Sequence, residues 1–168
     1  MKIKNIALVG NPNCGKTSLF NTLTGTRQKV ANYAGVTVER KEGSFKLPSG
    51  DAVRVLDLPG TYSLKPSSLD EEVTRAVCLG ELKGEILPDI FICVVDATNL
   101  SLHLSLVLEV RALNRPMILV LNMMDEVKKR GISIDKDKLS QLLGIPVVEA
   151  VAVKTKGIQD LILCTRQK

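Results

Sequence analysis

The segment Gly-Asn-Pro-Asn-Cys-Gly-Lys-Thr at residues 10–17 most constrains this chain. The apolar run 6–9 precedes it and predicts a strand that leads straight into it. Its two glycines let the backbone curl so that N–H groups converge on a phosphate, and a helix beginning near Lys16 adds its positive end. A plain glycine turn would not require the complete Gly-x4-Gly-Lys-Thr spacing. The segment therefore predicts a nucleoside triphosphate site.

This phosphate loop supplies most of the expected contacts. Lys16 would reach the β- and γ-phosphates, and the Thr17 hydroxyl would bind Mg²⁺. The predicted site includes Gly10, Asn11, Pro12, Asn13, Cys14, Gly15, Lys16, Thr17 and Ser18. Kinases, ATPases and GTPases share such a loop, so the nucleotide has to be identified from residues further along the chain.

A second motif, Asp57-Leu58-Pro59-Gly60, follows the apolar run 53–56. A carboxylate at the end of a parallel strand would face the phosphate loop. Asp57 would then hold Mg²⁺ through a water, and the Gly60 N–H would meet the γ-phosphate. The same four residues are also an ordinary turn sequence, which is the alternative interpretation.

Two further segments concern the base. Asn122-Met123-Met124-Asp125 follows the run 117–121, and the Asp125 carboxylate could accept both N1–H and N2–H₂ of guanine. Adenine has no such donor pair, so a buried polar mismatch would discriminate against it. The segment Val151, Ala152 and Val153 would offer the Ala152 N–H to guanine O6. Each segment has an alternative interpretation. The polar residues after the run 117–121 could simply cap a helix, and the apolar residues 151–153 could belong to the core. The order of all four motifs favours guanine.

The motifs resemble those of the small GTPases related to translation factors. Within that class, residues 30–43 and 57–64 resemble the amino-terminal G domain of the ferrous-iron transport protein B family, and the resemblance runs from about Ile6 to the end. It implies that Thr37 is a second Mg²⁺ ligand, with Gly35 and Val36 beside it; a β-branched strand residue is the alternative. Ala34 stands where family members typically have proline, which frees a φ angle.

Three positions bear on affinity and catalysis. Met123 replaces the usual lysine over the base, which predicts moderate or weak GTP affinity with selectivity intact. Thr61 stands where Ras-like proteins carry a water-orienting glutamine, so we expect slow hydrolysis. Relatives with asparagine at position 13 coordinate K⁺ beside the phosphates, although Asn13 could simply stabilise the turn. The expected catalytic residues are Lys16, Thr37, Gly60 and Asn13.

Composition fits one GTP-binding domain over residues 1–168. The chain is 45% hydrophobic but poor in aromatic residues, which predicts parallel strands rich in Leu, Val and Ile. No apolar stretch approaches the roughly 20 residues of a membrane span. The net charge of +5 is dispersed, which argues against nucleic acid as a partner. Four scattered cysteines indicate a reducing compartment, and the single His103 is interpreted as a surface or helix residue.

We predict an α/β, three-layer P-loop GTPase fold with a mostly parallel six-stranded sheet and one antiparallel strand. A turn is expected at 48–51 and a capping box at 68–71. Residues 26–40 and 60–67 are expected to be mobile loops that carry Gly, Ser and Thr rather than core residues. The expected strands are 4–10, 41–48, 52–58, 89–95, 116–122 and 146–150; the expected helices are 16–25, 68–83, 101–114, 136–143 and 157–166.

The resulting hypothesis is a GTPase switch that uses GTP or GDP, Mg²⁺ and K⁺. The family resemblance implies that the domain was excised from a longer membrane protein and regulates ferrous-iron transport from the cytoplasmic face of the inner membrane. The partners would be helical and transmembrane regions of that parent protein, which could also oligomerise. One alternative is a guanine-nucleotide sensor with negligible hydrolysis. Another is a ribosome- or tRNA-directed GTPase, which would need an appended RNA-binding domain.

Overall fold

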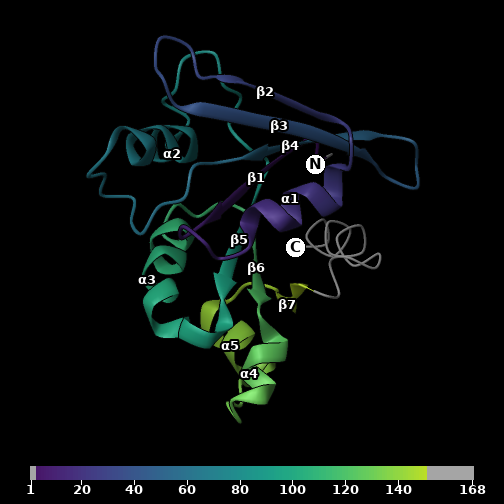
Figure 1. Ribbon diagram of the computed structural model, residues 1–168, viewed down its shortest axis with the longest axis vertical. Helices are drawn as coiled ribbons and strands as arrows, with labels where there is room; N and C mark the ends of the chain where they lie inside the picture. Colours follow the sequence, from purple (N-terminus) through teal and green to yellow (C-terminus); the bar gives the residue numbers. More distant parts are fainter. Residues whose placement is uncertain (1–2, 151–168) are drawn as a thin grey trace.

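The computed structural model describes residues 3–150, which form a twisted sheet with a single described helix on one face and the other helices on the opposite face (Figure 1). The sheet has seven strands in the order β2-β3-β4-β1-β5-β6-β7, and only β3 runs antiparallel to its neighbours. The strands are β1 (Asn5–Gly10), β2 (Gln28–Asn32), β3 (Glu39–Lys46), β4 (Ala52–Asp57), β5 (Ile90–Asp96), β6 (Met117–Asn122) and β7 (Val147–Glu149).

Side-chain alternation along the strands divides the core into two layers. Ala7 and Val9 of β1 belong to the cluster that also holds apolar residues of α2, α3, α4 and α5. Ile6 and Leu8 point the other way and pack with Leu19 of α1. The helices are α1 (Lys16–Thr24), α2 (Leu69–Leu79), η1 (Ala97–Asn99), α3 (Leu100–Arg111), α4 (Met124–Lys129) and α5 (Lys136–Leu143). Burial on both faces explains why the central strands are continuous apolar runs.

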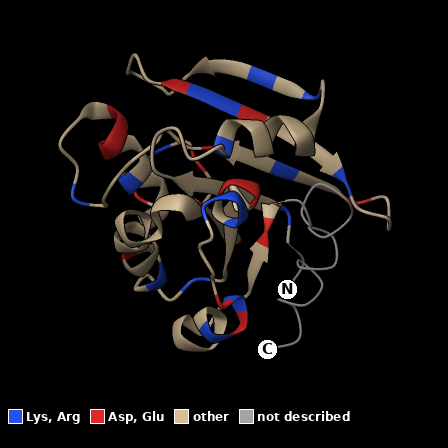
Figure 2. Cartoon of the chain, turned by 60° about the horizontal axis from the view of Figure 1, so that its bottom comes forward, with Lys and Arg blue, Asp and Glu red and all other residues tan. Residues whose placement is uncertain are grey.

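The sheet brings the predicted motifs to one edge. β1 lies between β4 and β5, and β6 follows β5, all in parallel. Leu8 pairs in register with Asp57, so the loop after β1 begins beside the end of β4. The carboxyl ends of parallel strands share one edge, where open α/β sheets bind their ligands. Figure 2 shows acidic and basic residues interspersed over the elements that surround this sheet.

The fold class and the single antiparallel strand are confirmed, but the count of six strands is wrong. The missing strand is β2, an exposed edge strand whose sequence Gln-Lys-Val-Ala-Asn lacks apolar alternation. The prediction of a mobile loop over these residues is therefore wrong. The short helix α4 was also missed. Conversely, α2 ends at Leu79 instead of residue 83, because Gly80 caps it in the left-handed conformation. The predicted helix 157–166 lies outside the described residues.

Several local predictions are confirmed. The helix 136–143 has the predicted bounds. The predicted turn at 48–51 is closed by the Leu47 N–H, which donates to the Asp51 carbonyl at 2.8 Å. Ser68 caps α2, since its Oγ accepts from the Glu71 N–H at 3.2 Å. His103 lies on α3 as expected of a helix residue, but it is buried, so the surface interpretation is wrong.

Candidate functional site

The phosphate loop joins β1 to α1 and is held against the end of β6. Gly15 has φ +91° at the start of α1. A Cβ atom at this position would lie 1.9 Å from Asn122 Nδ2, so no larger residue fits. The Asn122 Nδ2 donates to the Cys14 carbonyl at 2.9 Å. Asn122 therefore fastens the start of its motif to the phosphate loop, 108 residues away in sequence.

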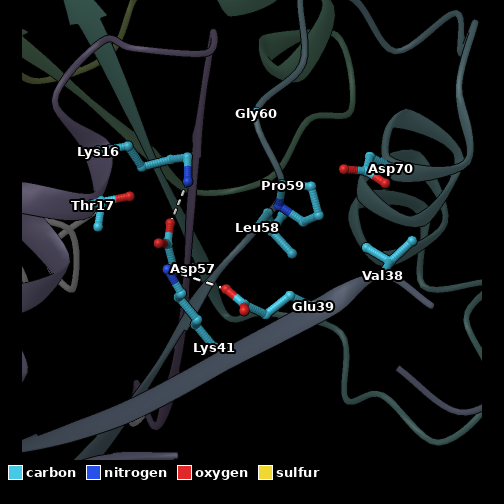
Figure 3. A pocket seen from close by; sticks show the side chains of 10 residues that line it. All are labelled: Lys16, Thr17, Val38, Glu39, Lys41, Asp57, Leu58, Pro59, Gly60 and Asp70. Atoms are coloured by element: carbon cyan, nitrogen blue, oxygen red, sulfur yellow. Dashed lines mark hydrogen bonds and ion pairs between the residues drawn. The ribbon is translucent and has the colours of Figure 1, made fainter. Parts of the chain in front are cut away.

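Lys16 and Asp57 form a buried ion pair beside this loop, with 8% and 6% of each residue exposed. The pair lies at an open pocket of about 220 Å³ that Thr17 and Gly60 also line (Figure 3). Each charge stabilises the other in this buried site, because burying either charge without its partner would cost free energy. The structure thus brings together four residues predicted from two separate motifs. Leu58 and Pro59 line the same pocket.

Gly60 packs directly on the phosphate loop. A Cβ atom at Gly60 would lie 3.0 Å from both the Cα and the N of Pro12. The next residue continues the contact, since the Thr61 N–H donates to the Gly10 carbonyl at 3.0 Å. The Thr61 side chain is fully buried, and its Oγ1 lies 2.6 Å from both Glu71 Oε2 and the Ser63 carbonyl. The sequence predicts a mobile segment without core residues here, and the burial of Thr61 contradicts that prediction.

Hydrogen bonds to the Glu71 carboxylate complete this arrangement. Ser67 Oγ donates to Glu71 Oε1 at 2.6 Å. Hydrogen bonds from Ser67 and then Thr61 lower the pKa of Glu71. The hydroxyl of Thr61 is therefore engaged by its own loop and by α2.

The loop before β3 is anchored at both sides of its apex. The Tyr33 N–H donates to the Val38 carbonyl at 2.9 Å, and both side chains are buried in the same cluster. Gly35 has φ +75° at the exposed tip, and Val36 is half-buried. Thr37 is exposed next to Val38, which lines the pocket, whereas Thr37 itself does not. The burial of Tyr33 and Val38 again corrects the expectation of a loop without core residues.

The remaining predicted residues differ in environment. Asn13 is exposed with φ +63°, and Ser18 is exposed on α1. Asp125 is exposed in the first turn of α4, whose N-cap Met123 has φ +62° and is 40% exposed. Asn11 is buried, and neither polar atom of its side chain has a hydrogen-bond partner among residues 3–150. Val151, Ala152 and Val153 lie outside the described residues.

Sequence reasoning missed three charged residues of the pocket: Glu39, Lys41 and Asp70. Lys41 pairs in register with Asp57 on the neighbouring strand, and its Nζ lies 3.2 Å from Glu39 Oε1 (Figure 3). The missed signal was the alternation along β3, which puts residues 39, 41 and 43 on the face that bears α1.

This parallel sheet, with a Gly-x4-Gly-Lys-Thr loop at its switch point, defines an α/β domain of the P-loop class. The model of the family described as ferrous iron transport protein B matches residues 4–164. The chain is 49% identical to the Fe(2+) transporter FeoB of Salmonella typhimurium over 165 residues, 96% of this chain and 21% of that protein. The chain belongs to the ferrous iron transport protein B family.

Solved structures agree with the fold. The G domain of the T. maritima FeoB iron transporter matches with 43% identity and a TM-score of 0.85, over 99% of this chain and all of that one. The cytosolic domain of the same transporter in its GMPPNP form matches with 43% identity and a TM-score of 0.87, over 99% of this chain and 65% of that one.

The chain spans about one fifth of the length of the curated relatives that it matches. In residues 3–150, no helix combines the length and apolarity needed to cross a membrane.

Proposed function

We propose that this chain is a GTP-binding domain that hydrolyses GTP slowly. The observation that carries the proposal is the meeting of three motifs at one edge of the sheet. Asp57 contacts the phosphate-loop lysine, and Asn122 contacts the phosphate-loop backbone. A site with this loop binds a triphosphate, and the carboxylate three residues after Asn122 selects the base.

The pocket residues fit Mg²⁺, which prefers oxygen ligands. The Thr17 hydroxyl and the Asp57 carboxylate line the same pocket, and Thr37 would add a third ligand from the neighbouring loop. Bound there, Mg²⁺ supplies positive charge to the phosphates. Lys16 would then exchange its contact with Asp57 for the β- and γ-phosphates, while the Gly60 N–H would donate to the γ-phosphate.

Guanine selectivity is assigned to Asp125, with Ala152 donating to guanine O6 and Met123 covering the base. The test is a comparison of dissociation constants for GTP and ATP. We expect GTP to bind at least tenfold more tightly, because adenine leaves a carboxylate unpaired. Similar constants for the two nucleotides would exclude the role of Asp125.

Slow hydrolysis is inferred from Thr61, whose hydroxyl is engaged by Glu71 and Ser63 instead of facing solvent. Asn13 would compensate by helping to bind K⁺ beside the phosphates, where extra positive charge stabilises the transition state. Turnover of wild type and Asn13→Ala in KCl and in NaCl tests this assignment. We expect KCl to accelerate only the wild type.

The same buried Thr61 favours a second candidate function, a guanine-nucleotide sensor in which occupancy is the signal. Equal and negligible phosphate release in all four conditions would support the sensor over the GTPase. Binding of GTP would remain in that case.

At the level of the parent protein, we propose that nucleotide state regulates ferrous-iron transport by an attached membrane region. The support is family membership and the names of relatives that are almost five times as long. Residues 1–168 would then be one G domain on the cytoplasmic face of the inner membrane, with helical and transmembrane regions of the same protein as partners. Iron uptake in cells that carry the full-length protein with Lys16→Met, compared with wild type, tests this role.

A further inference from the structure

Glu109 of α3 holds the loop that follows Gly60. Its Oε2 accepts the Leu64 N–H at 2.5 Å, and its Oε1 accepts from Ser63 Oγ at 2.8 Å. The Ser63 oxygen in turn accepts the Lys65 N–H at 3.0 Å. Two backbone donors and one hydroxyl are thereby satisfied through a single carboxylate that lies 45 residues away in sequence.

The other end of the same segment is held by the phosphate loop and by α2. Gly60 packs on Pro12, and the Thr61 N–H donates to Gly10. The carbonyl of Pro59 accepts from Thr74 Oγ1 of α2 at 2.9 Å. Residues 60–64 therefore contact the phosphate loop at one end and α3 at the other, and the two points of contact are only a few residues apart in sequence.

Short segments with both ends anchored have few conformations to lose when they meet a ligand. Removing the Glu109 anchor would leave the Leu64 N–H without its charged acceptor, and hydrogen bonds to charged groups are the stronger kind. The segment would then have to be ordered at the expense of binding energy. This cost falls on a ligand only if it contacts Gly60.

We propose that Glu109 is a positioning residue that keeps Gly60 ready to meet a γ-phosphate and so sets the preference of the pocket for GTP over GDP. The inference rests on the proposed function, since it assumes guanine-nucleotide binding. It assigns to α3 a part in nucleotide discrimination that the phosphate-binding motifs do not contain.

Glu109→Ala, Glu109→Gln and Glu72→Ala test the inference through the affinities of a non-hydrolysable GTP analogue and of GDP. Glu72 is an exposed glutamate of α2, so its variant matches the loss of charge. We expect Glu109→Ala to weaken the GTP analogue about tenfold, the size of one charge-assisted hydrogen bond, and GDP less than twofold. Glu109→Gln should weaken the GTP analogue less than Glu109→Ala does, because its amide oxygen can still accept from Leu64 and its NH₂ can donate to Ser63, although the acceptor is no longer charged.

Hydrogen exchange of peptides covering residues 61–66, measured without nucleotide, directly reports the contacts of Glu109 with this segment. We expect faster exchange in Glu109→Ala than in wild type, Glu109→Gln or Glu72→Ala. Unchanged exchange, or equal weakening of the two nucleotides, would overturn the inference and leave the proposed function intact. Wild-type protein that binds neither nucleotide would overturn both.

Discussion

At the scale of single residues, Asp57 and Lys16 show how one ion pair can preserve a binding site. Both side chains are almost fully buried, and each neutralises the other. A phosphate and a magnesium ion would provide the same neutralisation when the nucleotide binds. In the free protein, the ion pair therefore allows a phosphate-binding ammonium and a magnesium-binding carboxylate to be buried together.

This pairing predicts that Asp57→Ala destabilises the nucleotide-free protein. The uncompensated Lys16 ammonium should cost about 3 kcal/mol of unfolding free energy, at the low end for a broken buried pair. Urea denaturation measures it. The double variant Lys16→Met with Asp57→Ala should recover most of this loss, because it leaves no buried charge. A double variant no more stable than the single one would contradict the explanation.

Asp125 permits a sharper test of base selection. Asparagine at this position would replace an acceptor by an amide that can donate to the 2-oxo group of xanthine. We expect Asp125→Asn to weaken GTP at least a hundredfold and to bind xanthosine triphosphate better than GTP, because the hydrogen-bond polarity is reversed. Competition with a fluorescent nucleotide measures both affinities. The neighbouring Glu126→Gln is the control, and the same reversal there would refute the assignment.

At the scale of elements, each face of β3 carries its own pair of opposite charges. Lys41 and Glu39 face the pocket, whereas Arg40 and Glu42 face the opposite side. There, Arg40 and Arg54 both bind Glu85, the latter at 2.8 Å. Arg40 also lies over the ring of buried Tyr33, 6.0 Å from its centroid. This cluster connects the loop before β3 to the segment between α2 and β5.

The Glu85 cluster makes stability depend on pH. Burial alone would raise the pKa of Glu85, but hydrogen bonds and charges from Arg40 and Arg54 outweigh it and lower the pKa. A lowered folded-state pKa contributes stability fully above the unfolded value of about 4.3 and loses it as pH falls through the folded value.

Wild type should therefore lose more unfolding free energy than Glu85→Gln between about pH 5 and pH 3. Denaturation at several pH values measures the difference. Glu81→Gln, which removes a more exposed partner of Arg75, should follow the wild-type profile. Parallel profiles for wild type and Glu85→Gln would show that the cluster does not depend on this charge.

Elements differed in how well the sequence predicted them. Strands buried on both faces read as unbroken apolar runs, and α5 shows a capping aspartate, amphipathic spacing and a terminal Gly144. By contrast, β2 pairs on one side only and is mostly exposed, so burial left no pattern in its sequence. Tertiary pairing with β3 determines its conformation, and no local signal reports that pairing.

At the level of the whole molecule, the candidate site also combines features that the sequence predicts with features that depend on tertiary contacts. Motif spacing and strand ends predicted that the Asp57 and Asn122 segments would lie at the phosphate loop. Asp57 pairs with Lys16 of that loop, and Asn122 donates to the Cys14 carbonyl. The contacts that organise the site from outside these motifs were not predictable. Lys41 and Glu109 enter through strand register and helix packing, and both depend on contacts between distant segments.

A bound nucleotide would touch the ends of β1, β4 and β6 at once, so it should stabilise the whole fold. The unfolded chain has no such site, and a ligand at a hundred times its dissociation constant adds about 2.7 kcal/mol. For a domain of this size, that corresponds to a rise in Tm of roughly 5–11 °C. We expect GTP and GDP with Mg²⁺ to produce it in thermal unfolding, and ATP not to. Lys16→Met should reduce the shift, and an equal shift with ATP would contradict guanine selectivity.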